Sequence, residues 1–284
     1  MTAPLRDRTV LILGCGFTGQ RVARRALQAG AQVVATTRSP ARLYDLATAG
    51  ATIHALDVND AAQIASLRRA LPDNVLALHS IPLVSPAGQL SDPTRAVLDA
   101  LGSRIARLVY LSTTGVYGAT TDVDERTPAA PQTERQRLRY AAEQTIAAQP
   151  WPALVLRPAA IYGPGQGVHV SLPQGRYKLV GDGSNLVSRI HVDDLAQHCL
   201  AALQSTLTGA YPVADDEPAP AGQVAAFVAD LLGLPLPPSV GRDEVDETLR
   251  ADRRVDGRAI RAALGVTLIY PSYRVGIPAE LAAQ

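Results

Sequence analysis

The first half of the chain alternates short apolar runs with segments whose apolar residues recur at helical spacing. The apolar runs predict six strands: Thr9–Leu13, Gln32–Thr36, Thr52–Leu56, Val75–His79, Arg107–Ser112 and Ala153–Leu156. The segments between them predict helices that end near Gly30, Gly50 and Leu71, followed by Thr94–Leu101 and Thr133–Ala148. Strands that alternate with helices in this way predict an α/β fold with a doubly wound parallel sheet covered on both faces.

The alternation stops after Pro158, where a glycine-rich loop over residues 163–167 begins a different pattern. The later part of the chain predicts a short strand at Arg176–Val180. It also predicts helices at Asp194–Gln204, Gly222–Leu232 and about Gly257–Leu264. The helix at about Gly257–Leu264 is expected to be the last one in the chain. We therefore expect a domain over residues 1–158 and a smaller C-terminal substrate or lid domain over 159–284. Segments around 189–215 are expected to return to the first domain, so that the two are partly interleaved.

Composition narrows the class of protein. Hydrophobic residues make up 47% and charged residues 19% of the 284 residues, which is typical of a globular chain. The formal net charge is +1, without a basic block, which argues against nucleic acid or an anionic membrane as the main partner. No signal-peptide core or apolar run of membrane-spanning length is evident, so a cytoplasmic location is expected. The histidines and two cysteines show no metal-ligand spacing, so no metal site is predicted.

The basic residues are almost all arginines, because Lys178 is the sole lysine of the chain. Arginine stays protonated in proteins, so chemistry that needs a lysine with a lowered pKa has one candidate here.

A glycine-rich turn, Gly14-x-Gly16-x-x-Gly19, directly follows the first strand and opens the first helix. In this context the three glycines are typical of a Rossmann-type dinucleotide-binding turn. The second glycine lets the backbone approach a pyrophosphate, and the amides of Phe17 and Thr18 at the helix N-terminus face the anion.

The residues after the second strand indicate which dinucleotide is preferred. NAD sites place an acidic residue there for the ribose 2′-hydroxyl, whereas this chain has Thr37-Arg38-Ser39. Hydroxyls beside an arginine suit a 2′-phosphate through charge-assisted hydrogen bonds, so NADP is predicted over NAD.

Five stretches together carry a resemblance to a known family: Leu13–Gly19, Leu56–Val58, Leu111–Gly118, Leu156–Gly165 and Arg189–Ala196. They resemble, in order, the extended branch of the short-chain dehydrogenase/reductase superfamily, which contains the NAD(P)-dependent epimerases and dehydratases. The resemblance implies cofactor contacts from Asp57 and Val58 at the adenine, His79 and Ser80 along the cofactor, and Pro158 near the nicotinamide. It also places Thr113 where the family keeps its catalytic Ser or Thr.

The family's Tyr-x-x-x-Lys motif is degenerate in this chain. Members often place a Glu four residues after the Lys, and aligning on Glu143 puts Arg139 at the Lys position and Arg135 at the Tyr position. Arg139 keeps a positive charge for the nicotinamide ribose, but Arg135 cannot exchange a proton near neutral pH. Tyr117 or Tyr162 is then a candidate acid, with Tyr117 preferred. Alternatively, the substrate needs little acid catalysis, or NADP binds without turnover.

The same resemblance implies contacts with a small-molecule substrate from Tyr162, His169, Ser188 and Arg189. Val187 stands where nucleotide-sugar epimerases often place an arginine for the diphosphate, which disfavours a nucleotide sugar.

Two functions remain open at this level. One is an NADP-dependent oxidoreductase or epimerase that transfers a hydride to or from a small carbonyl or hydroxyl compound. The other is a catalytically impaired NADP-binding regulator that senses the redox state of the cofactor. A substrate-sized cavity beside the nicotinamide would favour the enzyme. A monomer and a homodimer are both compatible with the sequence.

Overall fold

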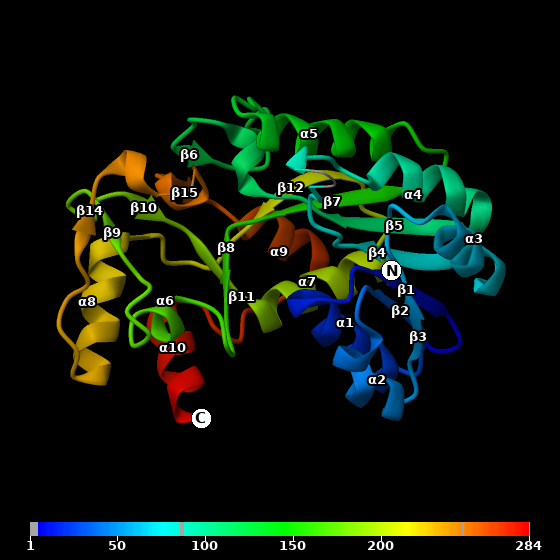
Figure 1. Cartoon of the computed structure of the whole chain (residues 1–284), viewed down its shortest axis with the longest axis horizontal. Helices are drawn as coiled ribbons and strands as arrows, with labels where there is room; N and C mark the ends of the chain where they lie inside the picture. The colour runs from blue at the N-terminus through cyan, green and yellow to red at the C-terminus, as the bar shows by residue number, and fades with distance from the viewer. Residues whose placement is uncertain (1–4, 86–87, 246, 284) are drawn as a thin grey trace.

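The structure is a computed structural model that describes residues 5–85, 88–245 and 247–283 (Figure 1). Its centre is a parallel sheet of seven strands in the order β12-β7-β5-β4-β1-β2-β3. Their bounds are β1 Thr9–Leu13, β2 Gln32–Thr37, β3 Thr52–Ala55, β4 Val75–His79, β5 Ile105–Leu111, β7 Ala153–Pro158 and β12 Gly209–Val213. This confirms the predicted doubly wound fold. The strand order reverses where β1 lies beside β4, the place at which such sheets bind ligands.

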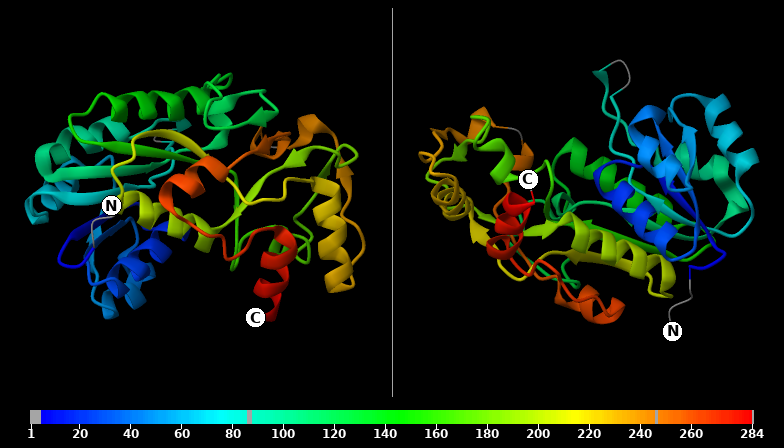
Figure 2. Two further views of the ribbon diagram at one scale, coloured as in Figure 1. Left: turned by 180° about the vertical axis from the view of Figure 1, so that it is seen from behind. Right: turned by 90° about the horizontal axis from the view of Figure 1, so that it is seen from below.

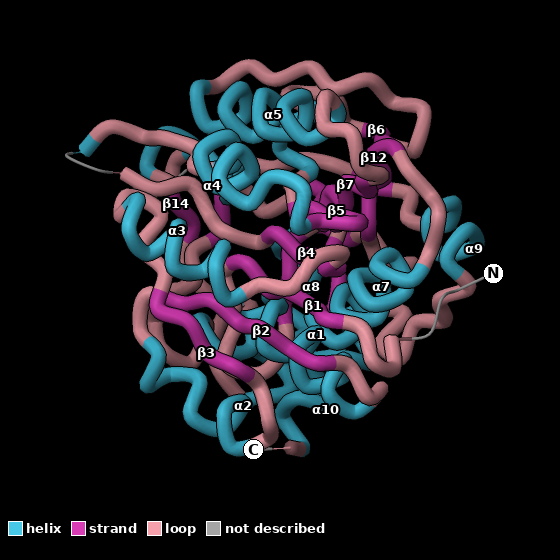
Figure 3. The backbone as a smooth tube through the Cα atoms, turned by 90° about the vertical axis from the view of Figure 1, so that its right-hand side faces the viewer, coloured by secondary structure: helices cyan, strands magenta, loops and turns pink. Residues whose placement is uncertain are grey.

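Helices cover both faces of the sheet (Figures 1 and 3). One face packs against α1 Phe17–Gln28, α2 Tyr44–Thr48, α7 Val192–Gln204 and α9 Arg258–Leu264. The other packs against α3 Ala61–Ala70, α4 Thr94–Leu101 and α5 Glu134–Ala147. Successive residues of β1 serve both cores, since Ile12 faces the first and Leu13 the second. The apolar runs are nearly continuous because both faces of each strand are buried.

The edge strand β12 has no counterpart among the six predicted strands. It pairs parallel with β7, and Tyr211 lies opposite Leu156 in the register. Pro212 lacks an amide for a ladder, which hides a strand in the sequence but is tolerated at a sheet edge. Helix α9 also packs on this side, against α7 and β12, although its sequence position falls in the predicted lid.

The remaining elements form a C-terminal lobe beside the sheet (Figure 2). Its helices are α6 Val168–Ser171, α8 Ala221–Leu232 and α10 Tyr273–Ala282. Short strands join in pairs: β8 Ala160–Tyr162 with β11 Arg189–His191, β9 Leu179–Val180 with β14 Ser239–Val240, β10 Leu186–Val187 with β13 Ala219–Pro220, and β6 Asp122–Val123 with β15 Arg254–Val255. Because β8 follows β7 after one residue, the lobe lies at the carboxyl end of that strand.

The prediction that the helical pattern ends near Leu264 was wrong, because α10 follows. This helix contains Gly276 and Pro278, both poor helix formers, so its local pattern is weak. Packing selects it instead: a Cβ added at Gly276 would lie 2.1 Å from the Tyr162 hydroxyl. No helix among the described residues is both long and apolar enough to cross a membrane.

Candidate active site

The glycine-rich turn leaves space where a dinucleotide pyrophosphate is expected. Gly14 has a φ of +80°, and a Cβ there would lie 2.9 Å from the amide nitrogen of Ile81. A Cβ at Gly16 would meet no atom within 4 Å, whereas one at Gly19 would lie 3.0 Å from the Ile12 side chain. The N-terminus of α1 has no side-chain cap. The turn therefore presents uncapped amides beside open space, which fits a dinucleotide phosphate.

Neighbouring strands hold this turn in place. The Thr36 hydroxyl at the end of β2 donates to the carbonyl of Ile12 over 3.2 Å and accepts from the amide of Gly14 over 3.0 Å. The Ser80 hydroxyl, after β4, donates to the Gly14 carbonyl over 2.8 Å. Ser80, predicted to lie along the cofactor, thus uses its hydroxyl to position the turn.

The residues after β2 are available to a ligand. Arg38 and Ser39 are exposed, and Thr37 Oγ1 accepts a hydrogen bond from the Ser39 amide over 3.2 Å. Within the described ranges, Arg38 has neither a hydrogen bond nor an ion pair. Asp57, after β3, caps a local turn by accepting from Asn59, and Val58 beside it is half-buried.

The His79 side chain, at the end of β4, points into the protein interior. The side chain is completely buried. Its Nε2 forms a hydrogen bond with the Thr94 hydroxyl over 2.9 Å, and its Nδ1 accepts one from the Ile81 amide over 3.3 Å. Burial, reinforced by the charge of Arg139, lowers the pKa of His79 to about 3, so the ring is neutral. These two hydrogen bonds hold the segment after β4 in place.

Arg139, at the position of the family's lysine, is held from three sides. Its Nη1 donates to the Tyr110 hydroxyl over 2.7 Å and to the Ile81 carbonyl over 3.2 Å. The same atom lies 3.4 Å from a carboxylate oxygen of Asp92. The guanidinium thereby contacts the segment at Ile81, which lies next to Gly14 of the glycine-rich turn.

Tyr117, the preferred candidate for the acid, is buried in the interior. Its side chain is 1% exposed, and its ring packs on the guanidinium of Arg157, whose Cζ is 4.8 Å from the ring centre. Burial raises the pKa of Tyr117. It does not line the cavity described below, so its predicted role as the acid has no support in the geometry.

A cavity of about 1060 Å³ lies between the sheet and the C-terminal lobe. The predicted residues that line it are Thr113, Pro158, Tyr162, Ser188 and Arg189. It is also lined by residues that were not predicted as site residues, among them Arg135, Arg176, Tyr177, Lys178 and Arg253. Elements far apart in the sequence thus meet at the carboxyl ends of β5 and β7.

Thr113 lies in this wall immediately after β5 and its flanking serine. Its Oγ1 accepts a hydrogen bond from the Gly115 amide over 3.0 Å, which leaves the hydroxyl proton available. Beneath it, the Ser112 hydroxyl donates to the buried carboxylate of Glu143 over 2.5 Å. Glu143 is also paired with Arg157, the residue before Pro158, at 2.6 Å.

The four predicted substrate residues have different surroundings. Tyr162 donates its hydroxyl to the Ser272 carbonyl over 3.3 Å, and burial raises its pKa. The Ser188 hydroxyl bonds to the backbone of Arg253 and Val255, so it joins segments of the lobe. Arg189 is 6% exposed and donates to the Val187 carbonyl over 2.7 Å. His169 is buried and lies outside the cavity lining, because α6 turns its ring inward.

Arg253 is a site residue that sequence reasoning missed. Its guanidinium donates to the backbone carbonyls of Thr114, Gly118 and Thr120, in the loop that follows Thr113. No local motif marks it, because it lies about 140 positions beyond its partners. Arg135 was also not predicted as a site residue, but its position was identified in the sequence, because it aligns with the tyrosine of the family's degenerate motif.

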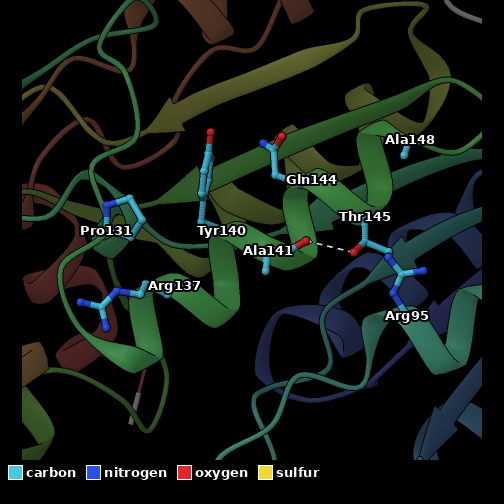
Figure 4. A pocket seen from close by; sticks show the side chains of 8 residues that line it. All are labelled: Arg95, Pro131, Arg137, Tyr140, Ala141, Gln144, Thr145 and Ala148. Carbon is cyan, nitrogen blue, oxygen red and sulfur yellow. Dashed lines mark hydrogen bonds between the residues drawn. The ribbon is translucent and has the colours of Figure 1, made fainter.

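A second, shallower pocket of about 510 Å³ lies on the outer side of α4 and α5 (Figure 4). It is lined by Arg95, Pro131, Arg137, Tyr140, Ala141, Gln144, Thr145 and Ala148. None of the predicted site residues belongs to it. The cavity at the carboxyl ends of the strands is therefore the candidate active site.

Known proteins resemble the chain over about half to nearly all of its length. A 2-alkyl-3-oxoalkanoate reductase of Stenotrophomonas maltophilia is 30% identical over 253 residues, covering 78% of this chain and 74% of that enzyme. A 3-diazoavenalumate denitrifying reductase of a Streptomyces species is 33% identical, and the match spans only 50% of its length. The solved structure of a conserved Silicibacter pomeroyi protein of unknown function is 34% identical, with a TM-score of 0.80 over 98% of this chain and 99% of that one.

The family model of the NAD dependent epimerase/dehydratase family matches residues 10–214, which include the glycine-rich turn and Thr113. The match covers the strands, the turn and the motifs in the order that the resemblance implied. The chain therefore belongs to the NAD-dependent epimerase/dehydratase family, on the extended branch of the short-chain dehydrogenase/reductase superfamily, and its cofactor is a nicotinamide dinucleotide.

Proposed function

We propose that this protein is an NADP-dependent oxidoreductase that reduces a carbonyl group of a small molecule. The observation that carries the proposal is the cavity of about 1060 Å³, lined by Thr113 and Pro158 at the carboxyl ends of β5 and β7. The dinucleotide turn follows β1 at the same edge of the parallel sheet. The volume of the cavity suits a small-molecule substrate. Two of the curated relatives are named as reductases, which favours reduction over epimerisation.

The residues present fit NADP. The open space at Gly16 and the uncapped start of α1 would hold the pyrophosphate, and Arg38 with Thr37 and Ser39 would bind the 2′-phosphate. Asp57 and Val58 would flank the adenine. When bound, the reduced cofactor supplies the hydride. No acidic side chain follows β2 in the sequence to favour the 2′-hydroxyl of NAD.

Thr113 would orient the reacting carbonyl. Its oxygen already accepts from Gly115, so the hydroxyl proton can be donated elsewhere, and a substrate carbonyl oxygen in the cavity would accept it. This hydrogen bond would stabilise the negative charge that develops on the oxygen during reduction. The Ser112–Glu143–Arg157 cluster positions Thr113 by fixing the ends of β5 and β7.

The proton that completes the alcohol would come from water in the cavity. Tyr117 is buried outside the cavity, and the Tyr162 hydroxyl is bonded to the Ser272 carbonyl. A substrate that needs little acid catalysis is therefore favoured among the alternatives. The open cavity beside Thr113 favours an enzyme over the NADP-sensing regulator.

A screen of carbonyl compounds, followed by NADPH absorbance, tests this function. Thr113→Ala should lower kcat/KM by about 100-fold, because it removes the donor to the developing oxyanion. Tyr117→Phe should change kcat/KM by less than about threefold, since its effect would be limited to packing. Full activity in Thr113→Ala, or its loss in Tyr117→Phe, would contradict the assignment.

A further inference from the structure

Cations gather on the wall of the active-site cavity. Arginine and lysine contribute seven of its lining residues, and Asp252 is the single acidic one. Asp252 accepts a hydrogen bond from the Leu186 amide over 2.8 Å. Among the described residues, no ion pair is formed by Arg135, Lys178 or Arg189. The molecule as a whole has a net charge of +1, so this wall is a local concentration of positive charge that attracts anions.

Arg135 brings one of these charges to the reacting end of the cavity. It lies in the first turn of α5, just after the cap Thr133, and lines the cavity together with Thr113. Arg139 follows four residues later, so both side chains lie on the same side of the helix. Arg139 contacts the Ile81 carbonyl behind the dinucleotide turn. Arg135 therefore lies on the side of α5 that faces the cavity wall of Thr113 and Pro158, where the nicotinamide is expected.

The N–H groups of the Arg135 guanidinium are available to bind a ligand. The side chain is exposed, and within the described ranges it has no hydrogen bond and no ion pair. Its neighbour Arg137 differs, since it donates to the Gln132 carbonyl over 2.5 Å and lines the outer pocket instead. Arg139 is engaged with three groups.

We propose that Arg135 binds a carboxylate of the substrate, so that the substrate is an oxo acid and not a neutral carbonyl compound. A guanidinium is a planar fork that matches the two oxygens of a carboxylate, and it cannot serve as an acid or base. At the position of the family's catalytic tyrosine, it would anchor the acid group while Thr113 holds the adjacent carbonyl oxygen. The inference rests on the proposed function, because the carbonyl is the one that Thr113 orients.

Binding of product analogues tests the inference without turnover. Calorimetry in saturating NADP⁺ compares 2-hydroxyoctanoate and 3-hydroxyoctanoate with their methyl esters. We expect at least one acid to bind the wild type at least about tenfold more tightly than its ester. Arg135→Gln should abolish this preference and leave ester binding unchanged. Arg135→Lys should retain part of it, since the charge remains without the fork.

The matched control is Arg137→Gln, on the same helix turn but outside the cavity, which should keep the preference for the acid. Thermal melting should be unchanged in Arg135→Gln, because the side chain is exposed and has no hydrogen bond or ion pair with the residues that the structure describes. Equal affinity for acid and ester, binding of neither acid, or an acid preference that survives in Arg135→Gln would each overturn the inference.

Parallel assays of NADPH oxidation separate this inference from the proposed function. Arg135→Gln should raise KM for an oxo acid more than it lowers kcat. Turnover of neutral ketones as fast as oxo acids would leave the reductase in place and overturn the role of Arg135. If acids bind through Arg135 but no carbonyl compound oxidises NADPH, the role of Arg135 would stand and the proposed reductase activity would be overturned.

Discussion

At the scale of single residues, the two sites proposed to bind anionic groups, the cofactor 2′-phosphate and the substrate carboxylate, each contain an arginine without an acidic partner. Arg38 and Arg135 are exposed and unpaired within the described part of the chain. Arg157, by contrast, is 6% exposed and paired with Glu143 at 2.6 Å. Exposed charges are inexpensive to leave unpaired in water, whereas a buried charge needs a counter-ion. The unpaired arginines are thus the ones available to ligands.

Arg38 tests the choice of cofactor. Arg38→Ala should weaken NADPH binding by about tenfold, because a hydrogen bond to a charged group contributes about 1.5–3 kcal/mol and is partly screened here. NADH binding should not change, since NADH has no 2′-phosphate. Fluorescence titration measures both affinities, and Arg42→Ala, an exposed neighbour, serves as the control. An unchanged ratio of NADPH to NADH affinity would contradict the predicted preference.

At the scale of elements, α5 connects the core to the site at a spacing of four residues. Thr133 and Gln136 form a capping box that sets where the helix begins. From there, Arg135 faces the cavity, Arg139 supports the segment after β4, and Glu143 pairs with Arg157. Positions four apart share one side of a helix, so a single element serves all three.

The buried ion pair between Glu143 of α5 and Arg157 of β7 is expected to stabilise the fold. Glu143→Gln leaves the buried charge of Arg157 without a counter-ion, so the free energy of unfolding should fall by about 3–5 kcal/mol. Glu134→Gln, exposed at the start of the same helix, should cost less than about 1 kcal/mol through the helix dipole. Urea unfolding of both variants measures the difference. Similar small effects in the two would mean that the pair does not hold α5 to the sheet.

At the scale of the whole molecule, the C-terminal lobe holds the loop that follows Thr113. Arg253 donates to three backbone carbonyls of that loop, and β15 beside it pairs with β6. The cavity therefore depends on contacts between segments that are distant in the sequence. Loss of such a contact displaces a catalytic group even when the core is intact.

Arg253→Gln should separate positioning from folding. Its kcat/KM should fall by at least about tenfold, because the loop that carries Thr113 loses its donors. Arg254→Gln is the adjacent control, since its side chain is 61% exposed and only approaches Asp122 at 3.9 Å. Kinetics and thermal melting of the two variants check this. Equal activity of both variants would show that the loop keeps its position without Arg253.

Much of the cofactor half could be predicted from local patterns. The strand, turn and helix around Gly14–Gly19 are adjacent in the sequence, so their spacing alone predicts a phosphate site. Side-chain directions could not be predicted in the same way. His79 and Tyr117 lie at predicted positions along the chain, yet packing turns both side chains into the interior.

The sequence by itself determined the parallel sheet, the dinucleotide turn and the chemical types of residue at the strand ends, because each depends on periodicity or spacing within one unit. Only the tertiary structure decided the edge strand β12, helix α10 and the composition of the cavity wall. Arg135, Lys178 and Arg253 meet there through long-range packing, which leaves no local pattern in the sequence.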